Sequence, residues 1–192
     1  WVIQNASNSA VGLHVIKLAR ARGIHTINVV RREKLFRPLK DHGADIVVLE
    51  GSDLSDRVRT EIDEARLPLA IDAVGGASCM HLADCLSDGG TVVNYGFLSG
   101  DPCMLTPTQT IVRQIKLVGF WLATSLFAKS QDVIKATYTE IAQMFIDGVF
   151  SLRWRPPIRS SRSRKLSNML AANNAPVKFS SPRMGRNHER FR

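Results

Sequence analysis

Cysteines and long apolar runs are scarce in this chain of 192 residues, and their scarcity excludes several classes of protein. The three cysteines, Cys79, Cys85 and Cys103, are an odd number, and their spacing matches no zinc-ligand or CxxC pattern. We therefore expect reduced, structural thiols in a reducing compartment, cytoplasmic or mitochondrial, rather than a disulfide framework. No apolar run approaches the ~20 residues that span a membrane, and no secretory leader is recognisable.

Acidic residues are almost missing from residues 151–192, which hold 11 of the 26 Lys and Arg but only one of the 17 Asp and Glu, Glu189. Residues 1–150 hold 15 basic and 16 acidic residues, so the net charge of +9 resides in the last segment. We predict a nearly neutral folded domain over 1–150 and a basic tail over 151–192, whose Arg, Ser and Pro content is typical of disorder. Because Trp1 already lies inside an apolar run, we expect the chain to begin within a longer protein.

Apolar strands alternate with amphipathic helices along residues 1–150, with glycines at the ends of the helices. Strands that are apolar throughout are typical of a parallel sheet covered on both faces. The pattern predicts an α/β fold with a doubly wound parallel sheet of the Rossmann type. The expected strands are 1–6, 24–30, 46–49, 69–74, 91–95 and 116–122, and the expected helices are 11–22, 33–42, 52–65, 77–86 and 129–147.

The first strand-to-helix turn, residues 5–12, lacks most of the glycines of a dinucleotide-binding fingerprint. Only Gly12 remains, at the position where helix and strand pack closely. Small Ala, Ser and Asn residues replace the others, so a backbone approach to a pyrophosphate at the helix N-terminus stays possible. The alternative is a capped helix start in another kind of α/β protein.

Two arginines, Arg31 and Arg32, end the second expected strand, about 20 residues beyond Gly12. An NAD enzyme places Asp or Glu there for the ribose hydroxyls, whereas arginine suits the 2′-phosphate of NADP. The sequence therefore predicts NADPH as the cofactor. The alternative is a solvated basic loop, and Glu33 could pair with either arginine.

The sequence resembles a known family in the runs WVIQNASNSAVG, INVVRRE, DAVGG, GGTVVNYG and KLVGFWL. The resemblance is to the enoyl thioester reductases of mitochondrial fatty-acid synthesis, in the zinc-free branch of the medium-chain dehydrogenase/reductase superfamily, and it covers roughly residues 1–150. It implies reduction of trans-2-enoyl thioesters with NADPH. It also implies that the family's catalytic tyrosine lies in a domain absent from this chain, so neither Tyr95 nor Tyr138 inherits that role. The chain alone should then be a very poor reductase.

The resemblance also implies a set of cofactor contacts. Arg31 would bind the 2′-phosphate, although the family often has Arg-Asp-Arg where this chain has Arg31, Arg32 and Glu33. The pyrophosphate would meet the first turn of the helix, and two later segments would lie near the nicotinamide and its ribose. The expected cofactor-binding residues are Asn8, Ser9, Ala10, Val11, Gly12, Arg31 and Arg32, then Tyr95, Gly96, Phe97 and Leu98 near the ribose, and Phe120, Trp121 and Leu122 beside the nicotinamide.

Residues 151–192 resemble none of the family's C-terminal segments. If residues 152–159 are encoded CTG CGG TGG AGG CCA CCT ATC CGA, joining each third base to the next two bases gives Ala-Val-Glu-Ala-Thr-Tyr-Pro. The same shift in residues 176–184 gives Gly-Lys-Val-Leu-Phe-Thr-Pro-Asn for one choice of codons. Both products resemble the family's missing segments. We therefore hypothesise a frameshift near Phe150, which sequencing of the gene would test.

The remaining candidate residues have simpler interpretations. The five histidines, His14, His25, His42, His81 and His188, show no ligand spacing and are expected on the surface or in helices. Asp72 is expected to cap the turn after its strand. Competing functions are another medium-chain reductase acting on an alcohol or a quinone, and a nucleic-acid-binding fragment using the basic tail. A homodimer through the strand near residues 116–122 is an expected partnership, and a membrane is not.

Overall fold

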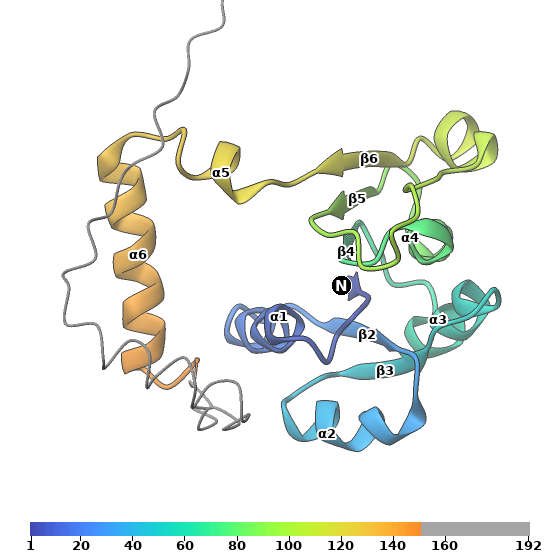
Figure 1. Ribbon diagram of the computed structural model, residues 1–192. Coiled ribbons are helices and arrows are strands. Elements are labelled where there is room, and N and C mark those ends of the chain that lie inside the picture. Colours follow the sequence, from blue (N-terminus) through green and yellow to red (C-terminus); the bar gives the residue numbers. More distant parts are fainter. Residues whose placement is uncertain (151–192) are drawn as a thin grey trace, which may run out of the picture. The chain divides into compact units, whose positions relative to one another are not determined.

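The structure, a computed structural model, describes residues 1–150. Six parallel strands form one sheet in the order β3-β2-β1-β4-β5-β6 (Figure 1). This is the strand order of the dinucleotide-binding doubly wound fold, so the predicted fold class is confirmed. The predicted basic tail and the frameshift hypothesis concern residues 151–192, which lie outside the described residues. The strands are β1 (Val2–Gln4), β2 (Thr26–Val30), β3 (Ile46–Leu49), β4 (Leu69–Asp72), β5 (Thr91–Asn94) and β6 (Lys116–Gly119).

The helices alternate with the strands as predicted, but some of their bounds differ from the expected ones. The expected helix over 33–42 divides into a 3₁₀ turn, η1, and α2, so that Pro38 falls in the first turn of α2, where its missing N–H does no harm. The expected strand over 116–122 was too long, because β6 ends at Gly119 and Leu122 begins α5. The elements are α1 (Ala10–Ala21), η1 (Glu33–Leu35), α2 (Phe36–Asp41), α3 (Leu54–Ile62), α4 (Gly76–Cys85), α5 (Leu122–Ser125) and α6 (Gln131–Ile146).

A π-helical turn, η2 (Thr108–Val112), is an element that the sequence analysis missed. Two reciprocal hydrogen bonds join residues that are three apart at the start of this turn. The Gln109 backbone N–H donates to Thr106 Oγ1 at 3.2 Å, and the Thr106 N–H donates to Gln109 Oε1 at 2.8 Å. This capping box is readable from the sequence as Thr followed three residues later by Gln.

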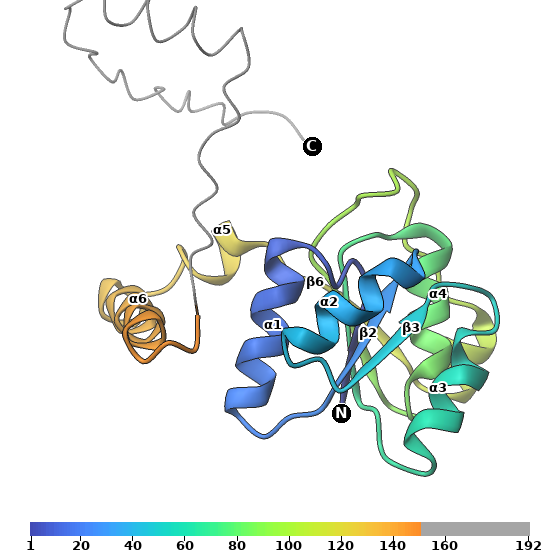
Figure 2. The same ribbon diagram turned by 90° about the horizontal axis from the view of Figure 1, so that it is seen from below.

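The core lies on both faces of the sheet, as the continuous apolar strands predicted. Alternate residues of a strand point to opposite faces. Val29 belongs to the cluster under α3 and α4, and Val30 to the cluster under α1 and α2. Figures 1 and 2 show the two pairs of helices on either side of the sheet. The carboxyl ends of β1, β2 and β3 therefore lie between two packed layers.

Helix α6 contacts α1 through a small aromatic group. The ring of His14 meets the rings of Phe145 and Phe150 edge to face, with centroids 6.5 and 5.0 Å away. Arg22 adds a surface ion pair with Glu140 at 3.0 Å. His14 lies in helix α1, which agrees with the expectation for the histidines, and it packs against these two rings. Among residues 1–150, no helix has the length and apolar character needed to cross a membrane.

Candidate dinucleotide-binding site

The turn between β1 and α1 has the geometry of a phosphate-binding turn. Ser9 is the N-cap of α1, and its hydroxyl accepts a hydrogen bond of 3.1 Å from the Gly12 backbone N–H. The other N–H groups of the first turn have no partner within a helix and point along its axis. Ala6 adopts a left-handed conformation, with φ of 46°, which turns the chain from the strand into the helix. The N-terminus of α1 thus opens toward the carboxyl edge of the sheet, where an anion is stabilised.

Gly12 is present because the backbone comes too close for a side chain. A Cβ atom at this position would lie 2.6 Å from the Ser7 carbonyl oxygen. The Gln4 side chain donates a hydrogen bond of 3.0 Å to the Gly12 carbonyl oxygen, which ties α1 to β1. The predicted close packing of helix and strand at Gly12 is therefore confirmed.

Asp72, at the end of β4, connects the ends of three strands. Its side chain is fully buried. It accepts hydrogen bonds from Asn5 Nδ2 at 2.6 Å, from Asn94 Nδ2 at 2.8 Å and from the backbone N–H groups of Val74 and Gly75 at 2.9 and 3.1 Å. Burial opposes ionisation of Asp72, but these hydrogen bonds together outweigh it and lower its pKa. The predicted turn-capping role is confirmed, and the bridges to β1 and β5 extend it.

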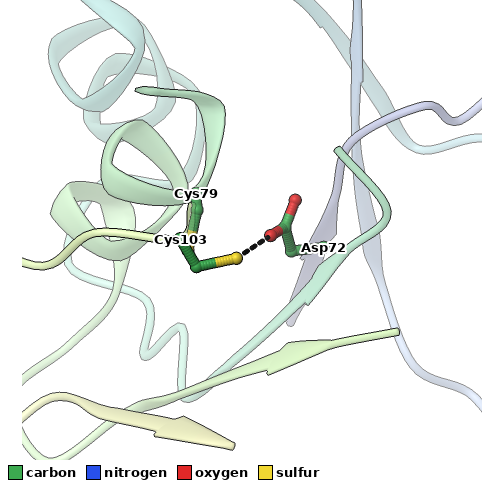
Figure 3. A group of neighbouring side chains, drawn as sticks. All are labelled: Asp72, Cys79 and Cys103. Atoms are coloured by element: carbon green, nitrogen blue, oxygen red, sulfur yellow. Dashed lines mark hydrogen bonds between the residues drawn. The ribbon is translucent and has the colours of Figure 1, made fainter. Parts of the chain in front are cut away.

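Cys79 and Cys103 adjoin Asp72, so that the two sulfur atoms and a carboxylate oxygen lie within 4.8 Å of one another (Figure 3). Cys103 Sγ donates to Asp72 Oδ2 at 3.6 Å. Burial, reinforced by the Asp72 charge, raises the pKa of both thiols. The Cys103 thiol thus links the loop after β5 to the carboxylate at the end of β4.

A cavity of about 290 Å³ lies at the carboxyl ends of β1, β2 and β3. It brings together the N-terminal end of α1, the end of β2 and the loop after β5. Four of the predicted cofactor-binding residues line it: Asn8, Ser9, Arg31 and Leu98. Apolar side chains from the strands and the loop after β4 complete the wall, including Val29, Val30 and Val74.

The other predicted residues lie around this cavity or further along the sheet. Ala10, Val11 and Gly12 form the first turn of α1, and Arg32 is exposed beyond β2. Tyr95 and Gly96 follow β5, next to the exposed Phe97. Burial raises the pKa of Tyr95, and the Ser9 hydroxyl only partly offsets this rise. Beyond β6 lie three exposed apolar residues, Phe120, Trp121 and Leu122.

The sequence analysis missed a polar group on the wall of the cavity. Glu50 directly follows β3, and its carboxylate accepts hydrogen bonds from Ser78 Oγ at 2.7 Å and pairs with His81 Nδ1 at 2.8 Å. His81 lies in helix α4, as expected for the histidines, and it has Glu50 as a specific partner. The signal was present, because Glu50 directly follows β3 just as Arg31 directly follows β2. The same rule about strand ends would have found it.

Comparison with known proteins agrees with this geometry. The mitochondrial enoyl-[acyl-carrier-protein] reductase of Dictyostelium discoideum is 48% identical over 126 residues, which are 63% of this chain and 36% of that protein. The corresponding protein of Bos taurus is 42% identical over 139 residues, 70% of this chain and 37% of that protein. The chain thus spans well under half the length of these curated relatives.

Solved structures give the same picture of the fold. An Etr1p variant in complex with NADP and crotonyl-CoA matches with a TM-score of 0.74 at 22% identity, over 90% of this chain and 51% of that one. The mitochondrial 2-enoyl thioester reductase heterodimer Etr1p/Etr2p of Candida tropicalis matches with the same TM-score, identity and coverage. The predicted resemblance to enoyl thioester reductases is confirmed. The family model described as zinc-binding dehydrogenase matches residues 10–140, and the chain belongs to that family.

Proposed function

We propose that this chain is the NADPH-binding domain of an oxidoreductase that reduces the 2,3-double bond of enoyl thioesters. The observation that carries the proposal is one cavity lined by both Ser9, at the N-terminus of α1, and Arg31, at the end of β2. The helix terminus suits a pyrophosphate, and the guanidinium suits a 2′-phosphate. The relatives named as enoyl reductases support the substrate class.

The residues of the site have distinct tasks in this proposal. The first turn of α1 and the hydroxyl of Ser9 bind the pyrophosphate, and Asn8 lies at the same end of the cavity. Asp72 holds the turn through Asn5, so that the N–H groups are oriented before the nucleotide arrives. NADPH, when bound, supplies the hydride for C3 of the thioester, and a proton must reach C2.

Nucleotide titration tests the proposal directly. NADPH and NADH are titrated into the wild-type chain and into the Arg31→Ala variant, with binding followed by calorimetry. The wild type should prefer NADPH. Loss of one charge-assisted contact costs about 1.5–3 kcal/mol, so Arg31→Ala should weaken NADPH binding by roughly 10- to 100-fold. The affinity for NADH should change little, and equal losses for both nucleotides would contradict the 2′-phosphate role.

The enzymatic part of the proposal needs its own assay. The full-length gene product is mixed with NADPH and crotonyl-CoA, and the loss of NADPH absorbance is followed. The products expected are the saturated thioester and NADP⁺. Turnover of an alcohol or a quinone, with none of the enoyl thioester, would favour the competing medium-chain reductases.

We also propose a homodimer that forms along β6. This strand is the last in the sheet order, and all four of its residues are exposed. Leu117 and Val118 on the strand, and Phe120 and Trp121 after it, give the open edge an apolar character. The heterodimer of the Candida tropicalis relative supports assembly of this kind. Sedimentation should show a dimer for the wild type and a monomer for Val118→Glu, and a monomeric wild type would exclude the idea.

A mitochondrial location is the last part of the proposal. It rests on the relatives, which are named as mitochondrial proteins. The reduced cysteines expected from the sequence suit that compartment. Fractionation of cells that express the full-length gene should recover the protein with mitochondria, and recovery in the cytosol alone would contradict it.

A further inference from the structure

Glu50 is a fixed carboxylate on the wall of the nucleotide cavity. Its side chain is 22% exposed, and both carboxylate oxygens are held, one by Ser78 and the other by His81, itself 19% exposed. Both partners come from α4, while Glu50 comes from the end of β3, so two elements determine the position of the carboxylate. Such a rigid acceptor in a ligand cavity is suited to recognition.

We propose that Glu50 accepts a hydrogen bond from the 6-amino group of the adenine ring and thereby selects adenine nucleotides. The inference rests on the proposed function, because it assigns the base of the same dinucleotide. It adds a specificity-determining residue that sequence analysis missed.

The order of the strands supports this assignment. Strands β1, β2 and β3 are direct neighbours in the sheet, and adjacent strands lie about 4.8 Å apart. Their carboxyl ends present Ser9, Arg31 and Glu50 in that order to one cavity. A pyrophosphate at β1 and a ribose 2′-phosphate at β2 leave the base to extend toward β3. The nicotinamide half must then run in the other direction, toward β4 and β5.

The side chains that line the cavity suit a purine base. Val30, Val74 and Leu98 offer apolar surface for the faces of a ring. A carboxylate offers about four lone-pair sites, and Ser78 and His81 use two of them. The remaining sites suit a donor such as the 6-amino group. The 6-oxo group of hypoxanthine is an acceptor and would face the carboxylate without a proton between them, which is unfavourable in a partly dry cavity.

Repulsion from the proposed 2′-phosphate explains why the Glu50 carboxylate is held in place. Glu50 shares the cavity with the proposed 2′-phosphate site, so a freely moving carboxylate would approach a second negative charge. The hydrogen bonds from Ser78 and His81 hold it against α4. They keep it within reach of the base and prevent it from pairing with Arg31, which stays available for the phosphate.

The test compares NADPH with nicotinamide hypoxanthine dinucleotide phosphate in its reduced form. The wild type should bind the adenine nucleotide about 10-fold or more tightly than the hypoxanthine one, the range expected when one polar partner becomes unpaired. Glu50→Gln should abolish or invert this preference, because the amide can donate to the 6-oxo group. The control Glu64→Gln makes the same change at an exposed carboxylate that does not line the cavity, and it should retain the preference for adenine.

The outcomes separate the inference from the proposed function. If the wild type binds both reduced nucleotides equally, Glu50 does not recognise the base, while the NADPH site stands. If Glu50→Gln folds, binds NADPH and keeps the wild-type preference, the inference is overturned in the same way. The wild-type comparison needs no variant, so poor folding of Glu50→Gln would not remove the test. If the wild type binds neither nucleotide, the proposed function and the inference fail together.

Discussion

Asp72 Oδ1 accepts a hydrogen bond of 2.6 Å from Asn5 Nδ2, and this contact joins the phosphate-binding turn to the end of β4. Asn5 returns a second bond, because its Oδ1 accepts from the Ala73 backbone N–H at 2.8 Å. The two strands are neighbours in the sheet but far apart in sequence. The shape of the nucleotide site therefore depends on one buried carboxylate outside the cavity wall.

Asp72→Asn is expected to destabilise the domain by about 3 kcal/mol or more. The introduced amide N–H₂ would face donors such as Asn94 Nδ2, leaving buried groups unpaired, and each lost bond to a charged acceptor costs about 1.5–3 kcal/mol. Urea denaturation at neutral pH measures the difference. Asp84→Asn, on α4, is the control, because it keeps an oxygen to accept the hydrogen bond that Asp84 receives from Gln109.

The difference in stability between the wild type and Asp72→Asn should depend on pH. The folded-state pKa of Asp72 is below its ordinary value of 3.8. Its stabilising contribution is therefore complete above that value and is lost as the pH falls through the lowered pKa. The stability difference between wild type and Asp72→Asn should narrow between about pH 4 and the acid limit. A difference that stays constant over that range would show that Asp72 does not ionise as described.

The sequence predicted a doubly wound parallel sheet covered by helices on both faces, because the apolar runs are long and the turns contain glycine. Gly12 was interpretable because a single rule, close packing at the helix start, applies to it. The links through Asn5, Asp72 and Asn94 were not predictable, since they join residues from three separate strands through side chains alone. Glu50 was readable as a strand-end residue, but its clamp by His81 depends on how α4 packs over β3.

Gly12→Ala is expected to destabilise the domain by about 1–3 kcal/mol, the usual cost of overpacking. The added Cβ would lie 2.6 Å from backbone, which cannot rotate away as a side chain can. Helix α1 would have to move from β1, so nucleotide affinity should fall as well. Gly119→Ala is the matched control, because a Cβ there meets nothing within 4 Å. A loss of stability in the control and none in Gly12→Ala would contradict the packing account.

Ala6→Gly is expected to stabilise the domain by roughly 1 kcal/mol. Ala6 holds a left-handed conformation that costs an L-residue about 1–2 kcal/mol, and glycine relieves that strain at a smaller entropic cost. Thermal denaturation measures the gain. Asp63→Gly relieves a similarly unusual conformation, with φ of 53°, outside the cavity, so it should raise stability without altering nucleotide binding. A destabilised Ala6→Gly would mean that the methyl group contributes packing worth more than the strain.

Arg31 and Arg32 should differ sharply in their effect on NADPH, although they are neighbours of one type. Successive residues of a strand point to opposite sides. Val29 faces the α3 and α4 layer and Val30 the other, so continuing the alternation places Arg31 on the side of the cavity and Arg32 away from it. Both residues are exposed, but Arg31 lines the cavity and Arg32 does not. An exposed charge that touches no ligand contributes little.

Arg32→Ala should therefore change NADPH affinity by about twofold or less, since an exposed charge outside the cavity is worth only a few tenths of a kcal/mol. Arg31→Lys should fall between the wild type and Arg31→Ala, because lysine keeps the charge but lacks the planar fork that binds two phosphate oxygens. The three variants are compared by calorimetric titration at two salt concentrations. The effect of Arg31→Ala should shrink at high salt, where the phosphate is screened. If Arg32→Ala weakens NADPH as strongly as Arg31→Ala, both guanidiniums hold the phosphate, and the loop after β2 must rearrange when the nucleotide binds.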